Sequence, residues 1–269
     1  VTNLAAEVAT INLIEETDNE VVNVAYATGS NAAHTLNFTG GAGDYETVTI
    51  SGNAGAFAVT ADEEFVVTSI TNNTATSLDI TTAVILELDN NGVALQATAA
   101  ADVTITTDGG DFEVSAAGGT VDVQEAERIT LNALDGSIII TDELQADGTD
   151  VSLDLTASGD DANDITIGLL TATNLSTLTA TASGGADITL SDIVYSGNDS
   201  AGDDTVVTMN LNSSGAGSTV TVSDLSVAAN VVLDSVVITT SDDGVVSFTS
   251  TDTDAEITAI DASGAAADA

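Results

Sequence analysis

The most constraining feature of this sequence is a short alternation of apolar and polar residues that recurs from one end of the chain to the other. Runs of Val, Ile, Leu and Thr alternate with polar residues and are bounded by Gly, Asn, Asp and Ser, which is the pattern of half-buried β-strands. In residues 206–212 (VVTMNLN), Val207, Met209 and Leu211 are predicted to point to one side of a sheet. Roughly 20 to 23 segments of this kind follow one another, and no stretch has a helical period. The sequence therefore predicts an all-β protein.

A weaker internal repeat indicates how the strands are arranged. It consists of a polar residue, Ile or Val, Thr and an aliphatic residue, then two residues, then often Leu or Ile. Intervals of about 30 residues, each long enough for several strands, are typical of the coils of a parallel β-solenoid, or β-helix. The sequence has no proline, which suits strands that are hydrogen-bonded on both sides. A solenoid is the main prediction, and tandem β-sandwich domains are the alternative. The first aliphatic positions of the repeat, which are 36, 23, 32 and 37 residues apart, are Ile129, Ile165, Ile188, Val220 and Ile257.

The sequence shows no clear domain boundary. We expect one elongated all-β domain over residues 1–261, with residues 1–100, where the repeat is sparsest, as a candidate separate β subdomain. Residues 262–269 (ASGAAADA) are small and mostly alanine, and we expect them to form a flexible or partner-docked tail.

The charge balance restricts the partners that the chain can have. The 269 residues include 43 Asp and Glu, no lysine and one arginine, Arg128, for a formal charge of −42. At most one or two carboxylates can form a salt bridge, so the others must be hydrated, held by backbone donors or neutralised by ions. Nucleic acid is excluded, because its phosphates require Lys or Arg, and so are anionic membrane surfaces. No run of about 18 apolar residues exists, so we expect no membrane insertion.

Clusters of acidic residues in predicted turns are the candidate ion sites. Calcium takes about six to eight oxygen ligands, which closely spaced carboxylates and carbonyls on a loop can supply. For any one cluster, a hydrated acidic turn is the alternative interpretation. We therefore predict calcium as the bound ion. The candidate ligands are Asp44, Asp62, Glu63, Asp89, Asp108, Asp111, Asp160, Asp161, Asp164, Asp199, Asp203, Asp204, Asp242 and Asp243.

Residues that would indicate an enzyme are scarce. His34 is the only histidine, and its neighbours Ala33 and Thr35 indicate the start of a strand rather than a member of a catalytic triad. Aromatic residues make up 3% of the chain and there is no tryptophan, whereas carbohydrate clefts usually need aromatic platforms. We expect no enzyme, with a secreted polysaccharide-active β-helix as the weakest alternative.

One segment and the overall composition resemble known secreted proteins. Residues 39–52 (TGGAGDYETVTISG) resemble the calcium-binding nonapeptide of RTX proteins. Gly40, Gly41 and Gly43 match that motif, whereas Asp44 falls one place early and Tyr45 takes the expected aspartate position. Abundant Ala, Thr, Ser, Val and Asp, with no cysteine and almost no Lys or Arg, is similar to the bodies of bacterial surface-layer and RTX-type proteins. This resemblance implies extracellular self-assembly that depends on calcium.

These observations predict an extracellular structural protein at the cell surface. It would be a homo-oligomer or homopolymer, a subunit of a surface layer, sheath or filament, with a cell-surface polysaccharide as a candidate anchor. The alternative is an adhesin or passenger segment of a larger secreted protein, in which this chain is a spacer.

Overall fold

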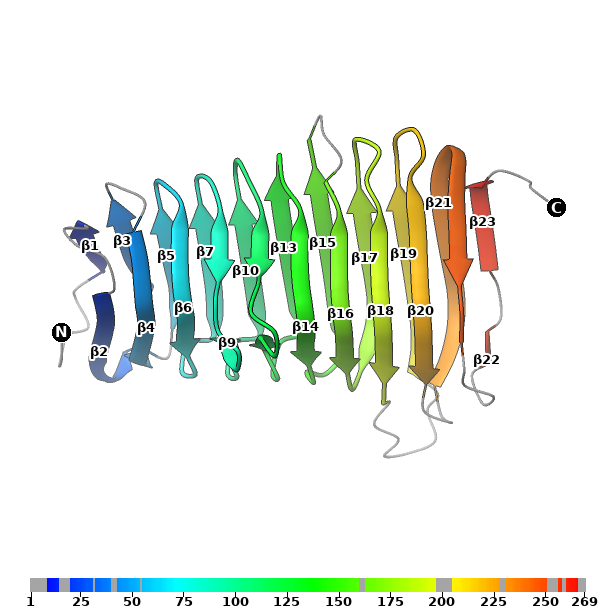
Figure 1. The fold of residues 1–269 in the computed structure, drawn as a ribbon. Coiled ribbons are helices and arrows are strands. Elements are labelled where there is room, and N and C mark those ends of the chain that lie inside the picture. The colour runs from blue at the N-terminus through cyan, green and yellow to red at the C-terminus, as the bar shows by residue number, and fades with distance from the viewer. Residues whose placement is uncertain are drawn as a thin grey trace.

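The computed structural model describes residues 9–14, 20–30, 32–39, 43–53, 55–159, 163–196, 205–227, 231–250, 256–257 and 260–265. Every regular element in these ranges is a β-strand, and every strand pair is parallel. The strands wind into coils that stack along one axis, with residues 10–14 at one end of the stack and residues 260–265 at the other (Figure 1). The predicted all-β parallel solenoid is therefore confirmed, and the chain does not form tandem sandwiches.

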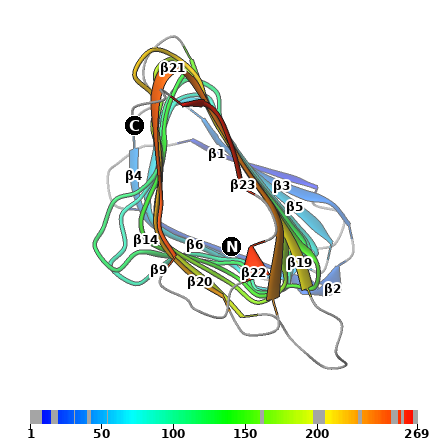
Figure 2. The ribbon, with the colours of Figure 1, turned by 90° about the vertical axis from the view of Figure 1, so that its right-hand side faces the viewer.

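Seen along the axis, the coils form a triangle (Figure 2). One side of the triangle is a single straight run of strands, which we call the flat sheet. The chain then turns at the apex and runs along the other two sides, which belong to the bent sheet. The strands of the flat sheet are β1 (Thr10–Ile14), β3 (His34–Thr39), β5 (Ala56–Ala61), β7 (Ser77–Thr82), β10 (Asp102–Thr107), β13 (Arg128–Leu134), β15 (Val151–Ser158), β17 (Leu175–Ala182), β19 (Thr205–Ser213), the first part of β21 (Val231–Phe248), β22 (Glu256–Ile257) and β23 (Ile260–Ala265).

The bent sheet changes direction where the in–out alternation of its strands is interrupted. In β16, the buried Ile167 and Leu170 are separated by two successive outward residues instead of one, so the strand turns a corner there. In two coils a short loop, 89–92 or 115–119, replaces this corner and divides the strand into two. The strands of the bent sheet are β2 (Glu20–Ser30), β4 (Gly43–Asn53), β6 (Phe65–Asn72), β8 (Leu86–Leu88), β9 (Val93–Gln96), β11 (Phe112–Val114), β12 (Thr120–Asp122), β14 (Ile138–Ala146), β16 (Ile165–Ala172), β18 (Ile188–Tyr195), β20 (Thr219–Val227) and the last part of β21.

The interior is filled by columns of side chains that stack in register from coil to coil, about 4.8 Å apart. All members of the column described here are at most 1% exposed. Consecutive members are between 21 residues (Phe57 to Leu78) and 31 residues (Leu178 to Met209) apart, which is the length of one coil. Burial of such apolar columns is the main stabilising contribution to the stack. The column consists of His34, Phe57, Leu78, Val103, Ile129, Leu153, Leu178, Met209 and Val236.

The sequence repeat proves to be a mixture of two positions. Ile165, Ile188 and Val220 are register partners on the bent sheet, so the intervals of 23 and 32 residues are true coil lengths. Ile129 and Ile257 lie on the flat sheet instead, and the intervals of 36 and 37 residues join different faces. Both faces need the same alternation of polar and apolar residues, so the phrase occurs on each.

The ladder is continuous around position 100. Strand β10 pairs with β7 on one side and with β13 on the other. At the other end, β23 covers residues 260–265, which include part of the segment expected to be a tail, and residues 266–269 lie outside the described ranges.

Candidate functional site

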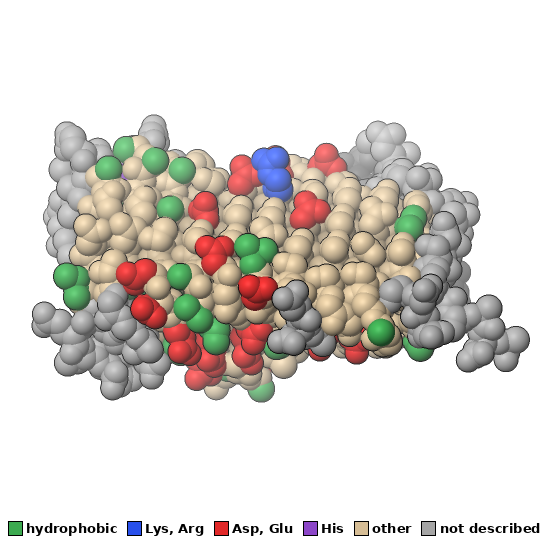
Figure 3. Space-filling model, turned by 90° about the horizontal axis from the view of Figure 1, so that it is seen from above, with side chains coloured by type: hydrophobic (Ala, Val, Ile, Leu, Met, Phe, Trp, Pro, Cys, Tyr) green, Lys and Arg blue, Asp and Glu red, His purple; other side chains and the backbone are tan. Residues whose placement is uncertain are grey.

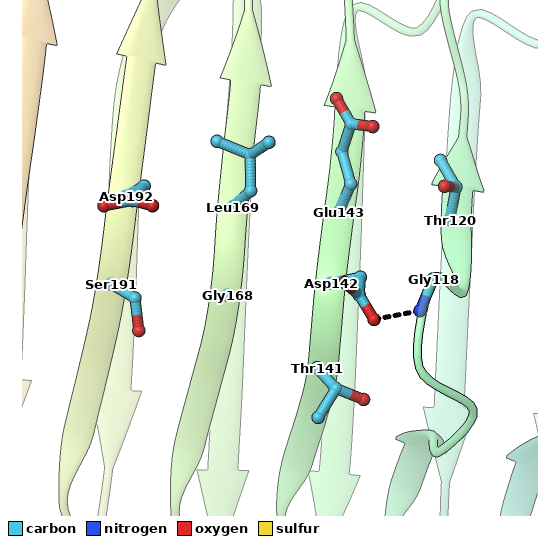
Figure 4. A pocket seen from close by; sticks show the side chains of 9 residues that line it. All are labelled: Gly118, Thr120, Thr141, Asp142, Glu143, Gly168, Leu169, Ser191 and Asp192. Atoms are coloured by element: carbon cyan, nitrogen blue, oxygen red, sulfur yellow. Dashed lines mark hydrogen bonds between the residues drawn. The ribbon is translucent and has the colours of Figure 1, made fainter. Parts of the chain in front are cut away.

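The described residues line a shallow groove at the corner of the bent sheet. It encloses about 570 Å³ and crosses β14, β16 and β18 next to the loop 115–119 (Figure 4). Three of its side chains are carboxylates and the others are small, hydroxylated or aliphatic. The lining residues are Gly118, Thr120, Thr141, Asp142, Glu143, Gly168, Leu169, Ser191 and Asp192.

The corner residues that line the groove lie in register from coil to coil. Glu143, Leu169 and Asp192 are successive register partners, and the residue before each completes the corner. At Gly168 the coils approach so closely that a Cβ atom would overlap the carbonyl oxygen of Thr141 in the preceding coil. Asp142 accepts a hydrogen bond from the backbone N–H of Gly118 (Figure 4), which fixes the loop against the corner.

A second cluster lies at the apex, immediately before the strands of the bent sheet. Asp111 accepts a hydrogen bond from the backbone N–H of Ser137, 2.7 Å away, and the Ser137 hydroxyl accepts one from the N–H of Asp164 at 3.1 Å. Asp164 then accepts from the N–H of Asp187 at 2.8 Å, and Asp187 from the N–H of Thr219 at 2.7 Å. Each side chain thus binds the backbone of the next coil. We call this series the aspartate ladder.

Four other carboxylates in the described ranges also accept a hydrogen bond from the next coil. Their donors are hydroxyl groups rather than cations. Such charge-assisted bonds are shorter and stronger than neutral ones, so they hold both the carboxylate and the neighbouring coil. The pairs, written donor to acceptor, are Ser115 to Glu87 at 2.9 Å, Thr171 to Glu143 at 2.9 Å, Thr173 to Asp147 at 2.5 Å and Thr149 to Glu127 at 3.2 Å.

Carboxylates are register partners at two places on the bent sheet, Glu87 with Glu113 and Asp192 with Asp224. Glu113 of β11 is the register partner of Glu87 in β8. Burial is the largest cause that raises the pKa of Glu113 above its ordinary value, and the neighbouring carboxylates of Glu87 and Asp111 add to it. The folded chain therefore favours the protonated form of Glu113 more than an unfolded chain does.

The single arginine and the single histidine each contact a neighbouring side chain. Arg128 forms an exposed ion pair with Asp102 on the neighbouring strand, with its Nη2 atom 2.6 Å from the carboxylate. His34 is buried at 1% exposure at the end of an interior column, and its ring lies 3.9 Å from that of Tyr26. Burial raises the pKa of Tyr26.

The predicted calcium ligands are distributed over the coils. Asp62, Glu63, Asp89 and Asp108 are exposed residues that directly follow strands, and Asp111 and Asp164 belong to the aspartate ladder. Within the described residues, no three carboxylate or histidine side chains gather closely enough to hold a metal ion. Asp44, Asp242 and Asp243 lie in strands, and their side chains are outside the described set. The remaining candidates, Asp160, Asp161, Asp199, Asp203 and Asp204, lie outside the described residues altogether.

The residues that line the groove were not among the sequence candidates. Asp142, Glu143 and Asp192 lie inside strands, where a carboxylate resembles an ordinary outward residue. A signal was nevertheless present, because the two residues between Leu190 and Ile193, Ser191 and Asp192, interrupt the alternation. That two-residue interval marks the corner of the sheet.

Comparison with known proteins adds no family to this description. No protein-family model, curated protein or solved structure matches the chain. Within the described ranges, no helix has the length and hydropathy needed to cross a bilayer.

Proposed function

We propose that this chain is an extracellular structural protein, a self-assembling subunit of a surface layer, sheath or filament. One observation carries the proposal: several carboxylates at the apex and at the corner accept hydrogen bonds between coils and so strengthen the rod. The hydrogen-bonded ladder gives a regular body whose outer faces repeat every coil, and repeating faces suit periodic contacts with identical neighbours.

Divalent cations, calcium foremost, are assigned to contacts between copies. Two copies of a chain with a formal charge of −42 repel one another, and ions from the medium must screen or bridge their surfaces. Exposed carboxylates after the flat-sheet strands, such as Asp62 and Asp108, are suitable groups for such bridges. No calcium site within a single chain is needed for this role.

Electron microscopy of the purified chain, with calcium and with a chelator, tests the proposal. We expect ordered polymers or sheets with calcium and their dispersal by the chelator. Particles that remain monomeric under both conditions would contradict it.

The second candidate function, a spacer in an adhesin or passenger segment, is favoured by the same continuous ladder, because a rod holds its two ends apart. The two functions differ in their response to calcium: a spacer remains a single rod when calcium is added, whereas an assembling subunit does not.

A further inference from the structure

The outer face of the flat sheet from β13 to β21 has an unusual composition. Its outward side chains form four columns, and nearly all of them carry a hydroxyl or an amide group. The exceptions are Arg128, Leu134, Asp154 and Val237. We call the whole area the hydroxyl face. Its hydroxyl and amide residues are Thr130, Asn132, Ser152, Thr156, Ser158, Thr177, Thr179, Thr181, Ser183, Thr208, Asn210, Asn212, Ser214, Ser235 and Thr239.

The hydroxyl face is nearly free of charge in a chain that carries 43 carboxylates. Among its described side chains, Asp154 is the only acidic one, and Arg128 at the edge is paired with Asp102. In Figure 3 this face is the broad tan area between the blue arginine and the grey residues toward the C-terminal end. Red side chains are concentrated elsewhere on the same view.

The hydroxyl face is also flat and regular. One of its columns contains only threonine and asparagine from β13 to β21. Threonine is branched at Cβ and therefore stiff, and the ladder already pairs the backbone groups beneath it. A rigid, uncharged array remains, in which identical or similar side chains repeat at each coil. The column consists of Asn132, Thr156, Thr181, Asn212 and Thr239.

We propose that a second copy of this chain packs on the hydroxyl face, with the two flat sheets face to face. This inference rests on the proposed self-assembly and identifies the surface through which two copies first pair. Without bridging cations, two bodies so strongly negative repel one another least where each brings few carboxylates. Stacked parallel strands with short polar side chains form dry, interdigitated interfaces when two such sheets meet about 10 Å apart.

The dimensions and the charges suit a symmetric pair. Five strands about 4.8 Å apart and four side-chain columns about 6.7 Å apart cover about 600 Å² on each partner, near the lower limit for specific interfaces. When the pair is centred on β17 and the two rods run in opposite directions, β15 of one copy faces β19 of the other. Asp154 then lies opposite Asn210, whose amide can donate to the carboxylate. The acidic side chain therefore does not meet its own copy.

The test compares two variants with the same change of charge. Thr181→Asp places a carboxylate at the centre of the hydroxyl face, between Thr156 and Asn212. Thr189→Asp, the control, places one on the bent sheet between Thr166 and Thr221. Sedimentation velocity is measured with chelator and high NaCl, so that calcium bridges are absent and general repulsion is screened. We expect the wild type and Thr189→Asp to pair, and Thr181→Asp to have a dissociation constant at least tenfold higher.

A crosslinking measurement keeps the inference testable if Thr181→Asp alters the fold. The chain has no cysteine, so Ser183→Cys at the edge of the hydroxyl face and Ser191→Cys at the corner of the bent sheet each provide a single thiol. Facing sheets about 10 Å apart are too far for a disulfide, which needs Cα atoms about 4.4 to 6.8 Å apart. A short bismaleimide is therefore the reagent. We expect crosslinked dimers from Ser183→Cys and not from Ser191→Cys.

The outcomes separate this inference from the proposed function. Calcium-dependent polymers that form equally well in Thr181→Asp would overturn the assignment of the face and leave the structural function in place. A wild-type chain that is monomeric in every condition contradicts both. Wild-type monomers that are retained on an insoluble polysaccharide, with Thr181→Asp not retained, would assign the face to a glycan and overturn the pairing.

Discussion

The outer face of the flat sheet and the apex of the solenoid differ in how their carboxylates are arranged. On the flat sheet, no described carboxylate has another carboxylate as its register partner, and Asp102 is paired with Arg128. At the apex, Asp164 and Asp187 follow one another in the aspartate ladder. The difference lies in the available donors. Within a sheet the backbone N–H groups are already bonded to neighbouring strands, whereas just before a strand they remain available to a side chain.

This contrast explains how a chain with a single arginine can hold many carboxylates. Acidic residues in the interior of the flat sheet would have only neighbouring side chains as donors, and threonine and asparagine take those positions instead. At the apex and the corner, carboxylates accept hydrogen bonds from backbone N–H and hydroxyl groups of neighbouring coils. The acid-rich composition and the sheet are compatible because the two kinds of residue occupy different places.

The largest effect is expected from stacked carboxylates introduced into the flat sheet. Thr156→Asp with Thr181→Asp places two carboxylates on adjacent strands with no cation beside them. Unfavourable strand propensity and repulsion at about 4.8 Å together should lower the free energy of unfolding by about 3 kcal/mol at low salt, and high salt should restore part of it. Urea unfolding at both salt levels measures this, with the double Asn variant as control. A loss that salt does not change would contradict the electrostatic explanation.

The next effect concerns the corner of the bent sheet, where Gly168 lies against the backbone of the preceding coil. Gly168→Ala forces a Cβ atom against the carbonyl oxygen of Thr141, and overpacking of this kind costs about 2 kcal/mol. At Gly92, on the loop that replaces the corner in another coil, an added Cβ would meet only the Asn90 side chain at 3.6 Å. Gly92→Ala should therefore be close to neutral. Equal melting temperatures for the two variants would contradict the close approach of Gly168 to the backbone of Thr141.

The fold was largely predictable from the sequence, because alternation with a regular interval is a local property. Val207, Met209 and Leu211 were correctly placed on one side of a strand, and all three are buried. The repeat was only partly interpreted. Ile165 and Ile188 were identified as equivalent positions, but Ile129 belongs to the flat sheet, since both sheets require the same local pattern.

The candidate site was much less predictable, because its donors come from the next coil. Asp111 and Asp164 were recognised as acidic turn residues, yet their partners Ser137 and Asp187 are 26 and 23 residues away. Nothing in the local sequence indicates that pairing before the register is known. Glu143, inside a strand, gave no signal except the interrupted alternation beside it.

The aspartate ladder provides a direct test of the contrast between the two regions. Asp164→Ala leaves the backbone N–H of Asp187 without its acceptor, and the loss of a charge-assisted hydrogen bond should cost about 1.5 kcal/mol. Asp154→Ala, on the flat sheet between Thr130 and Thr179, removes the same charge and should change stability by less than about 0.5 kcal/mol. Chemical denaturation of both variants measures the difference. A larger loss of stability in Asp154→Ala than in Asp164→Ala would contradict the stabilising role given to the aspartate ladder.

The smallest effect is expected at Glu87 and Glu113, one of the two places on the bent sheet where carboxylates are register partners. Glu113 has a raised pKa in the folded chain, first through burial and then through Glu87 and Asp111. The folded state therefore loses stability as the pH rises from the ordinary Glu range through this raised pKa. Glu113→Gln should melt slightly higher than the wild type at neutral pH, and the two should converge at pH values below the ordinary Glu pKa. Glu125→Gln, in an exposed turn, removes the same charge and controls for net repulsion. A Glu113→Gln advantage that persists at low pH, or an equal advantage for Glu125→Gln, would show that the raised pKa of Glu113 is not the cause.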